Sequence, residues 1–267
     1  MKSLNPLSYS VYGDNKENSI IFLHGFMGSK NDWQFLVNKL QKSYYCVLID
    51  LPGHGSSKPD KIQDYSFDNC ADNIISLLND LNIEKCGLVG YSMGGRAALY
   101  TLLKYPERFS RIILESVNPG IEDEDERTNR AENDRKTAGM ILNDDFSKFL
   151  NDWYSQPVFG NIADNENYSV LLKSRSENDR EGLANSLHYM GTGIQPPLWN
   201  RIPDINTEIL YIAGEFDSKY VKIGRRLMSI KNDLRFEIMD NAGHNTHFQQ
   251  PEVFQKKVAE FFTQQEV

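Results

Sequence analysis

A serine between glycines is the part of the sequence with the clearest chemical meaning. The segment Gly90–Gly95 reads GYSMGG, follows the apolar run Cys86–Val89 and precedes a helical pattern over Arg96–Leu103. This is a G-x-S-x-G motif between a strand and a helix, where a strained turn lifts a serine hydroxyl above a parallel sheet. Glycine is needed in such a turn because larger side chains would clash. The motif therefore makes Ser92 the candidate reactive group.

A serine hydroxyl is inert without a base and an acid that orients the base. In folds with this motif the partners follow in the order serine, acid, histidine. Asp217 comes directly after the sixth predicted strand, and His244 comes after the seventh. We therefore predict a catalytic triad of Ser92, Asp217 and His244. Glu215 is the alternative acid and His247 the alternative base, although we expect His247 to be solvated or to support the site from behind.

Two further loops belong beside this triad. The loop after strand Ile20–His24 should supply one backbone N–H to a developing oxyanion, and the residue after the nucleophile should supply the other. Phe26 and Met93 are the predicted donors. A second glycine-rich loop, Asp50–Ser56, lacks the patterns that cradle phosphate. We interpret it as a structural turn near the pocket, in which His54 supports the site rather than taking part in catalysis.

Seven segments are predicted to be strands. Six are mostly apolar, which is typical of strands buried on both faces of a sheet, whereas the first is short and alternating and should lie at an edge. In chain order they are Ser8–Tyr12, Ile20–His24, Tyr45–Asp50, Cys86–Gly90, Ile112–Ser116, Glu208–Ala213 and Arg235–Met239.

Helical patterns separate most of these strands, which predicts a doubly wound α/β sheet. The alternation stops after Asn118 and resumes at Ile202. We therefore predict a core of residues 1–118 and 203–267, and a helical cap of residues 119–202 above the carboxyl ends of the strands. The helices expected in the core cover Asp32–Gln41, Ser66–Leu81, Lys219–Ser229 and Pro251–Thr263, and those in the cap cover Arg127–Ile141, Asp145–Tyr154, Ser169–Glu177 and Glu181–Met190.

Composition limits the classes of function. The 267-residue chain has a formal net charge of −8, which argues against a nucleic-acid partner. The sequence contains no apolar run of the ~20 residues that would cross a bilayer, and the N-terminus lacks a signal-peptide pattern. Three cysteines without metal-ligand spacing indicate free thiols in a reducing, cytoplasmic setting.

The acidic run Glu122–Glu126 should form a solvated loop or the start of a helix.

The motifs around these residues resemble those of a particular group of α/β-hydrolases. Phe22–Phe26, Asp50–Gly55 and Gly90–Gly95 are similar to the superfamily in general. The more specific matches are Gly94–Arg96, Glu115–Gly120, Arg127–Arg130, Asp152–Phe159, Gly214–Lys219 and Ala242–Asn245. Together they resemble the 2-succinyl-6-hydroxy-2,4-cyclohexadiene-1-carboxylate synthases of menaquinone and phylloquinone biosynthesis. The similarity runs from about Ile20 to the C-terminal helix and includes the cap.

The resemblance implies a lyase that eliminates pyruvate from 2-succinyl-5-enolpyruvyl-6-hydroxy-3-cyclohexene-1-carboxylate, without a metal or an organic cofactor. In this reaction the serine, made basic by the histidine, would remove a ring proton. The substrate carries three carboxylates, which arginine can bind bidentately. By resemblance, Arg96, Arg130 and Arg175 take this role, and Tyr91 and Trp153 also lie in the pocket.

Two other functions fit the same residues. A serine hydrolase, either a carboxylesterase or a C–C bond hydrolase acting on a substrate with carboxylates, would use the same triad, because a fold alone does not determine the reaction. A ligand-binding protein without catalysis is the second alternative. Relatives of that kind typically lack one triad residue, whereas this chain has all three.

Overall fold

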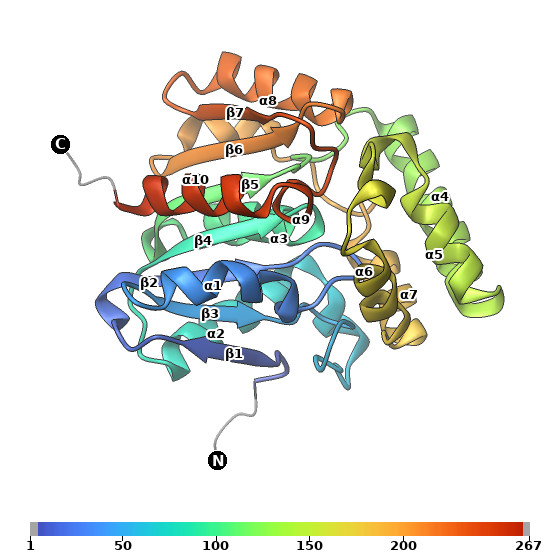
Figure 1. Ribbon diagram of the computed structural model, residues 1–267, viewed down its shortest axis with the longest axis horizontal. Coiled ribbons are helices and arrows are strands. Elements are labelled where there is room, and N and C mark those ends of the chain that lie inside the picture. Colours follow the sequence, from blue (N-terminus) through green and yellow to red (C-terminus); the bar gives the residue numbers. More distant parts are fainter. Residues whose placement is uncertain (1–4, 264–267) are drawn as a thin grey trace.

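The computed structural model describes residues 5–263. Its centre is a seven-stranded sheet in the order β1-β3-β2-β4-β5-β6-β7 (Figure 1). β1 pairs with β3 antiparallel, and every other neighbouring pair is parallel. The strands are β1 Tyr9–Tyr12, β2 Ser19–Leu23, β3 Tyr45–Ile49, β4 Cys86–Tyr91, β5 Phe109–Glu115, β6 Glu208–Gly214 and β7 Arg235–Met239.

The seven predicted strands are confirmed, with shifts of up to three residues at their ends. β2, β3 and β4 are buried along their whole length, as near-continuous apolar runs require. β7 differs from the expectation of burial on both faces, because only Met239 is buried there. The reason is its position at the edge of the sheet, where it has a single neighbouring strand.

Helices cover both faces of the sheet. One face packs against α1 and α10, and the other packs against α2, α3 and α8 (Figure 1). Successive residues of β2 alternate between the two layers: Ile20 and Phe22 face α1 and α10, whereas Ile21 and Leu23 face the opposite layer. These helices are α1 Gln34–Leu40, α2 Phe67–Asp80, α3 Met93–Lys104, α8 Ser218–Ile230 and α10 Pro251–Thr263, with the short α9 Thr246–Gln249 before the last.

Four helices between β5 and β6 lie beside the carboxyl ends of the strands (Figure 1). We call them the cap helices: α4 Glu124–Asn143, α5 Phe146–Tyr154, α6 Tyr168–Ser176 and α7 Arg180–Met190. Their apolar side chains form a cluster of their own, which also includes Met27 from the loop after β2. The expectation that the acidic run is solvated is confirmed, since Glu122–Glu126 is exposed and begins α4. Acidic side chains in a first turn are favourable because they face the positive end of the helix dipole.

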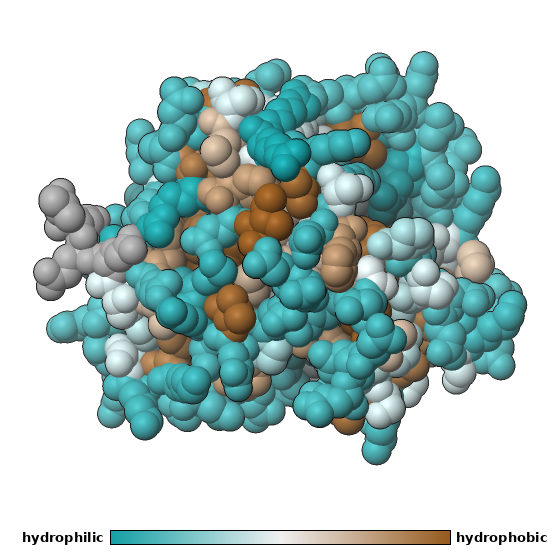
Figure 2. All heavy atoms as spheres, turned by 45° about the horizontal axis from the view of Figure 1, so that its top comes forward, coloured by the Kyte–Doolittle hydropathy of each residue, from teal (hydrophilic) through white to brown (hydrophobic). Residues whose placement is uncertain are grey.

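Short 3-10 segments complete the chain: Lys16–Asn18, Lys30–Trp33, Ile62–Tyr65, Pro106–Arg108, Pro157–Phe159, Ile162–Asp164 and Trp199–Asp204. None of the helices in the described part is long and apolar enough to cross a membrane. On the face that Figure 2 presents, hydrophilic side chains predominate and hydrophobic ones occur in small separate groups.

Candidate active site

Ser92 lies on a sharp turn between β4 and α3. Its backbone has φ 49° and ψ −109°, a region that non-glycine residues seldom occupy. The Ser92 N–H donates to the Glu115 carbonyl oxygen at 2.8 Å, which ties the turn to the end of β5. The turn is also crowded, because a Cβ atom on Gly94 would lie 2.3 Å from the Leu23 oxygen and 2.4 Å from the His24 oxygen.

This crowding gives a first prediction. Gly94→Ala should destabilise the fold by about 1–3 kcal/mol, because the added methyl group meets backbone atoms that have no room to move. The matched control is Gly139→Ala in α4, where nothing lies within 4 Å of the added atom. That substitution should instead stabilise by about 0.5–1 kcal/mol, since alanine is the better helix former. Denaturant unfolding of both variants measures the difference, and equal midpoints would contradict the prediction.

The three residues of the predicted triad form one chain of hydrogen bonds. His244 Nε2 lies 2.8 Å from Ser92 Oγ, and His244 Nδ1 lies 2.7 Å from Asp217 Oδ2. Because the carboxylate of Asp217 can only accept, Nδ1–H donates to it and Nε2 is left to accept the Ser92 hydroxyl proton. Asp217 is only 1% exposed and also accepts from the Tyr220 N–H at the start of α8. The arrangement can deprotonate the serine hydroxyl and hold the resulting imidazolium.

The alternative acid and base lie elsewhere. Glu215 is exposed, and its carboxylate accepts from the Asn241 N–H at 3.0 Å. His247 is buried, which excludes the solvated one of the two expected positions, and its Nδ1 lies 2.7 Å from Glu115. Among the described residues, neither side chain hydrogen-bonds to Ser92 or His244.

The two residues predicted to be oxyanion donors line the same cavity as Ser92. In the part of the chain that the structure describes, no acceptor bonds to the N–H of Phe26 or of Met93. Met93 is the first residue of α3, so its N–H has no partner within the helix and lies at the positive end of the helix dipole. Free N–H groups of this kind can stabilise negative charge on a substrate oxygen.

Two buried histidines hold the loop that carries Phe26. His54 Nε2 accepts from the Met27 N–H at 3.1 Å, and His24 Nε2 accepts from the Leu51 N–H at 3.0 Å. Burial lowers the pKa of both imidazoles, that of His54 to about 3. Both rings are therefore neutral at physiological pH, as accepting a hydrogen bond requires. The expectation that His54 lies near the pocket in a supporting position agrees with this contact.

Ser92 faces a cavity of about 230 Å³ between the sheet and the cap helices. All predicted site residues except Asp217 line it, and Asp217 lies behind His244. The lining that the sequence had singled out consists of Phe26, Tyr91, Ser92, Met93, Arg96, Arg130, Trp153, Arg175 and His244. Trp153 packs against Phe26 with ring centroids 5.6 Å apart, so the cap closes directly over the oxyanion loop.

Arg96 is a buried cation in this cavity. Its Nη1 donates to the Met190 carbonyl at 2.7 Å and to Gln195 Oε1 at 3.3 Å. Among the described residues it forms no salt bridge with a carboxylate, and burial lowers its pKa to about 10. A buried charge without a counter-ion is costly to the fold. Such a group is suited to binding an anion that comes from outside the chain.

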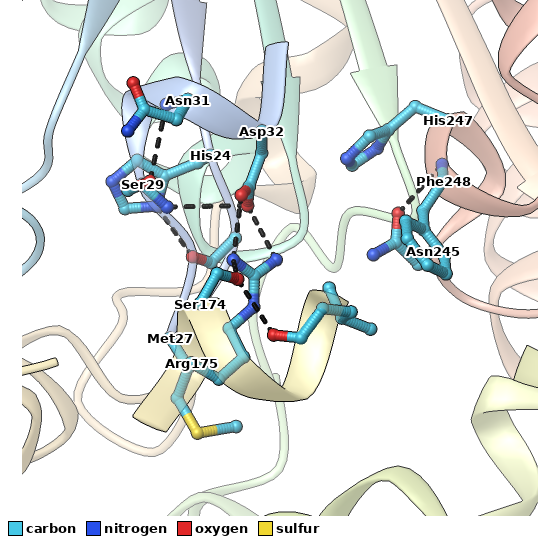
Figure 3. A network of polar contacts seen from close by, with 12 residues as sticks. His24, Met27, Ser29, Asn31, Asp32, Ser174, Arg175, Asn245, His247 and Phe248 are labelled. Atoms are coloured by element: carbon cyan, nitrogen blue, oxygen red, sulfur yellow. Dashed lines mark hydrogen bonds and ion pairs between the residues drawn. The ribbon is translucent and has the colours of Figure 1, made fainter. Parts of the chain in front are cut away.

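The other two arginines already have acidic partners. Arg130 donates from Nε to Asp134 Oδ1 at 2.7 Å, and its side chain is 36% exposed. Arg175 is buried and binds Asp32 bidentately at 2.8 and 2.7 Å (Figure 3). Burial by itself would lower the pKa of Arg175, but Asp32 and Tyr154 raise it above its ordinary value. The structure thus places Arg175 in the cavity wall with most of its donors engaged.

Several lining residues were missed by the sequence analysis. Lys219 and Tyr220 follow Asp217 in the first turn of α8 and line the cavity. Their closeness in sequence to the predicted acid could have indicated that they belong to the site. The rings of Tyr220 and His244 have centroids 4.5 Å apart. Asp32 and Thr192 also line the cavity, and no local pattern marks either one. They reach the site only because distant segments fold together.

Comparison with known proteins identifies the family. Residues 18–251 match the family model of the alpha/beta hydrolase fold. The chain is 39% identical over 255 residues to a putative 2-succinyl-6-hydroxy-2,4-cyclohexadiene-1-carboxylate synthase of Bacillus subtilis, covering 94% of this chain and 92% of that protein. It is 33% identical to the synthase of the same name from Photorhabdus laumondii, covering 88% and 82% of the two chains.

Solved structures agree with these sequence matches. The structure of MenH from S. aureus superimposes with a TM-score of 0.90 at 29% identity, covering 95% of this chain and 97% of that one. A thermophilic esterase from Thermogutta terrifontis has a TM-score of 0.82 at 19% identity, over 96% and 92% of the two chains, and shares the fold alone. The chain therefore belongs to the α/β-hydrolase fold family and, within it, to the 2-succinyl-6-hydroxy-2,4-cyclohexadiene-1-carboxylate synthases.

Proposed function

We propose that this chain is a lyase that eliminates pyruvate from 2-succinyl-5-enolpyruvyl-6-hydroxy-3-cyclohexene-1-carboxylate to give 2-succinyl-6-hydroxy-2,4-cyclohexadiene-1-carboxylate. The observation that carries the proposal is that a catalytic base and several arginines lie at the same cavity. A serine with an aligned base faces a space whose walls contain Arg96, Arg130 and Arg175. The synthase names of the relatives support the same reaction.

The triad would act as a base in this reaction. His244 Nε2 takes the proton of Ser92 Oγ as the serine oxygen removes a proton from the ring of the substrate. The electrons of that C–H bond form the second ring double bond, and the C–O bond to the enolpyruvyl group breaks. The departing enolate takes up a proton and becomes pyruvate. Asp217 keeps the imidazole in the required tautomer and stabilises its positive charge.

The basic side chains would bind the substrate as a polyanion. The substrate has carboxylates on the ring, the succinyl arm and the enolpyruvyl group. Three arginines and Lys219 line the cavity, against the single lining carboxylate of Asp32. Asp32 is already paired with Arg175, so the field in the remaining space is positive. Charge-assisted bonds to arginine would hold the ring with its proton toward Ser92.

A serine hydrolase is the second candidate, and one observation favours it. The N–H groups of Phe26 and Met93 have no acceptor among the described residues, and both residues line the cavity with Ser92, which fits the oxyanion hole that acyl transfer to a serine requires. The arginines oppose this candidate, because a neutral ester offers them no partner.

One experiment separates the two candidates. The purified chain is given the enolpyruvyl cyclohexene substrate while pyruvate is followed with lactate dehydrogenase and NADH, and p-nitrophenyl acetate is tested in parallel. The lyase proposal predicts rapid pyruvate release with slow ester hydrolysis. Rapid ester hydrolysis without pyruvate release would overturn the lyase proposal in favour of the hydrolase.

Arg96→Met tests the proposed binding of carboxylate. The substitution keeps the length of the side chain and removes its charge. We expect KM for the carboxylate substrate to rise by about 10- to 100-fold, as for the loss of a charge-assisted hydrogen bond. The melting temperature should hold or rise, since an uncompensated buried charge is removed. Arg135→Met, an exposed arginine in α4, is the control that should change neither quantity. A fall in melting temperature with an unchanged KM would contradict the prediction.

A further inference from the structure

A carboxylate lies buried directly behind the triad. Glu115 is the last residue of β5 and is 0% exposed. Among the described residues, no lysine or arginine forms a salt bridge with it. It instead accepts three hydrogen bonds from the chain just after His244, namely from Thr246 Oγ1 at 2.6 Å, from the His247 N–H at 2.9 Å and from His247 Nδ1 at 2.7 Å. A buried carboxylate is thus bound by the first two residues of α9.

The same residue also touches the nucleophile segment. The Glu115 carbonyl accepts the Ser92 N–H at 2.8 Å, and Glu115 lies opposite Tyr91 in the register of β4 and β5. Its backbone therefore holds the serine turn, while its side chain holds the start of α9, which follows His244 by two residues. These are the two segments whose separation sets the 2.8 Å contact between Ser92 and His244.

The His247 ring is fixed on its other sides by aromatic residues. Its centroid lies 4.4 Å from that of Trp33 and 4.9 Å from that of Tyr91, the latter edge-on. The ring lines a second cavity, of about 600 Å³, whose wall includes Asp32 and Arg175 (Figure 3). His247 makes no hydrogen bond to the triad within the described residues, so it cannot transfer the proton of Ser92 directly.

We propose that Glu115 is a positioning residue for the catalytic base. Its carboxylate acts as a fixed anchor for Thr246 and His247 and thereby sets the position of His244 relative to Ser92. Glu115 contacts both ends of the Ser92–His244 pair, with its carbonyl oxygen at the Ser92 end and its carboxylate at the His244 end. A displacement of about 1 Å between reacting groups can cost about 100-fold in rate. Loss of the contacts made by Glu115 should therefore lower the rate strongly. The proposal rests on the proposed role of the triad.

Glu115→Leu tests the proposal. Leucine roughly keeps the size of the side chain but has no acceptor, so the Thr246 hydroxyl and the backbone and ring N–H groups of His247 lose their partner. We expect kcat to fall by about 10- to 100-fold while KM changes by less than about 3-fold, because the arginines are untouched. His247→Asn is a second variant: its amide N–H can replace the Nδ1 donor, so it should keep most of the wild-type kcat.

A chemical probe makes the result independent of the substrate. The rate at which a fluorophosphonate labels Ser92 reports the reactivity of the serine without any substrate, and it should fall in Glu115→Leu in parallel with kcat. Glu208→Leu, at the opposite end of the neighbouring strand β6, is the matched control and should leave both rates unchanged. A lowered melting temperature with wild-type kcat and labelling rate would show a merely structural role and overturn the proposal. Wild-type protein that is labelled rapidly yet releases no pyruvate would overturn the lyase function instead, and the labelling rates of the variants would still decide the role of Glu115.

Discussion

Ser92→Ala should abolish nearly all pyruvate release, with a fall in kcat of at least about 10³-fold. The reason is that, among the described residues, only the Ser92 oxygen forms a hydrogen bond with His244 Nε2, at 2.8 Å. The arginines and the cavity walls remain, so the affinity for the substrate should change only a few-fold. Binding to the inactive variant can be measured by titration calorimetry, and turnover by the coupled assay for pyruvate.

Ser116→Ala is the matched control for this variant. Ser116 follows the neighbouring strand β5, has a similar backbone conformation with φ 51°, and its Oγ has no hydrogen-bond partner among the described residues. The same chemical change on the same kind of strained residue should leave kcat within a few-fold of wild type. If Ser92→Ala kept more than about a tenth of the wild-type turnover, neither the proposed base nor a serine nucleophile would be tenable.

Asp32→Ala should destabilise the fold by about 3–5 kcal/mol, because it leaves the buried Arg175 without its counter-ion. The side chains of Asp32 and Arg175 are 12% and 3% exposed, and two hydrogen bonds of 2.7 and 2.8 Å join them. The pair connects the segment after β2 to α6, so its loss should loosen the cap at that point (Figure 3). Denaturant unfolding of the variant measures the loss.

Asp152→Ala is the control, since Asp152 forms an exposed ion pair with Lys148 at 3.8 Å and should contribute less than about 0.5 kcal/mol. Asp32→Ala/Arg175→Ala should recover part of the stability, because no unpaired charge remains buried. A loss below about 1 kcal/mol for Asp32→Ala alone would contradict the prediction.

The same pair should make stability depend on pH. Burial by itself would raise the pKa of Asp32, but Arg175 holds it below its ordinary value. A carboxylate with a lowered native pKa stabilises the fold above its ordinary pKa, and this contribution is lost as the pH falls through the native value. We therefore expect the difference in the free energy of unfolding between wild type and Asp32→Ala to become smaller as the pH falls below the ordinary pKa of an aspartate. Denaturant unfolding at neutral and acidic pH measures this change.

The regular elements could be predicted from local patterns because each one repeats a simple periodicity. The apolar runs of β2, β3 and β4 and the one-sided apolar face of α2 are local properties of the chain. The partial exposure of β7 could not be predicted in the same way. Whether an apolar strand lies inside the sheet or at its edge depends on which strands pair, and that is decided by distant segments.

The residues of the candidate site also fall into two groups, those with a local sequence signature and those whose contacts depend on distant segments. Gly90–Gly95, Asp217 and His244 were found from the sequence because the serine turn has its own signature and the loops that follow parallel strands converge at one edge of the sheet. The engagement of Arg175 by Asp32, 143 positions away in the chain, has no local signature. Whether His247 is solvated or supports the site could not be decided from the sequence, because its burial depends on Trp33 and Glu115 from two other segments.

The sequence by itself determined which groups can react, since the identity of a side chain and the turn that carries it are local matters. The tertiary structure alone decided which of these groups are free to act. Ser92 and His244 lie 2.8 Å apart, Arg96 has no acidic partner in the described part of the chain, and Arg175 is already neutralised by Asp32. Charges and hydrogen bonds act over a few ångströms, so their balance is fixed only when residues remote in sequence are brought into contact.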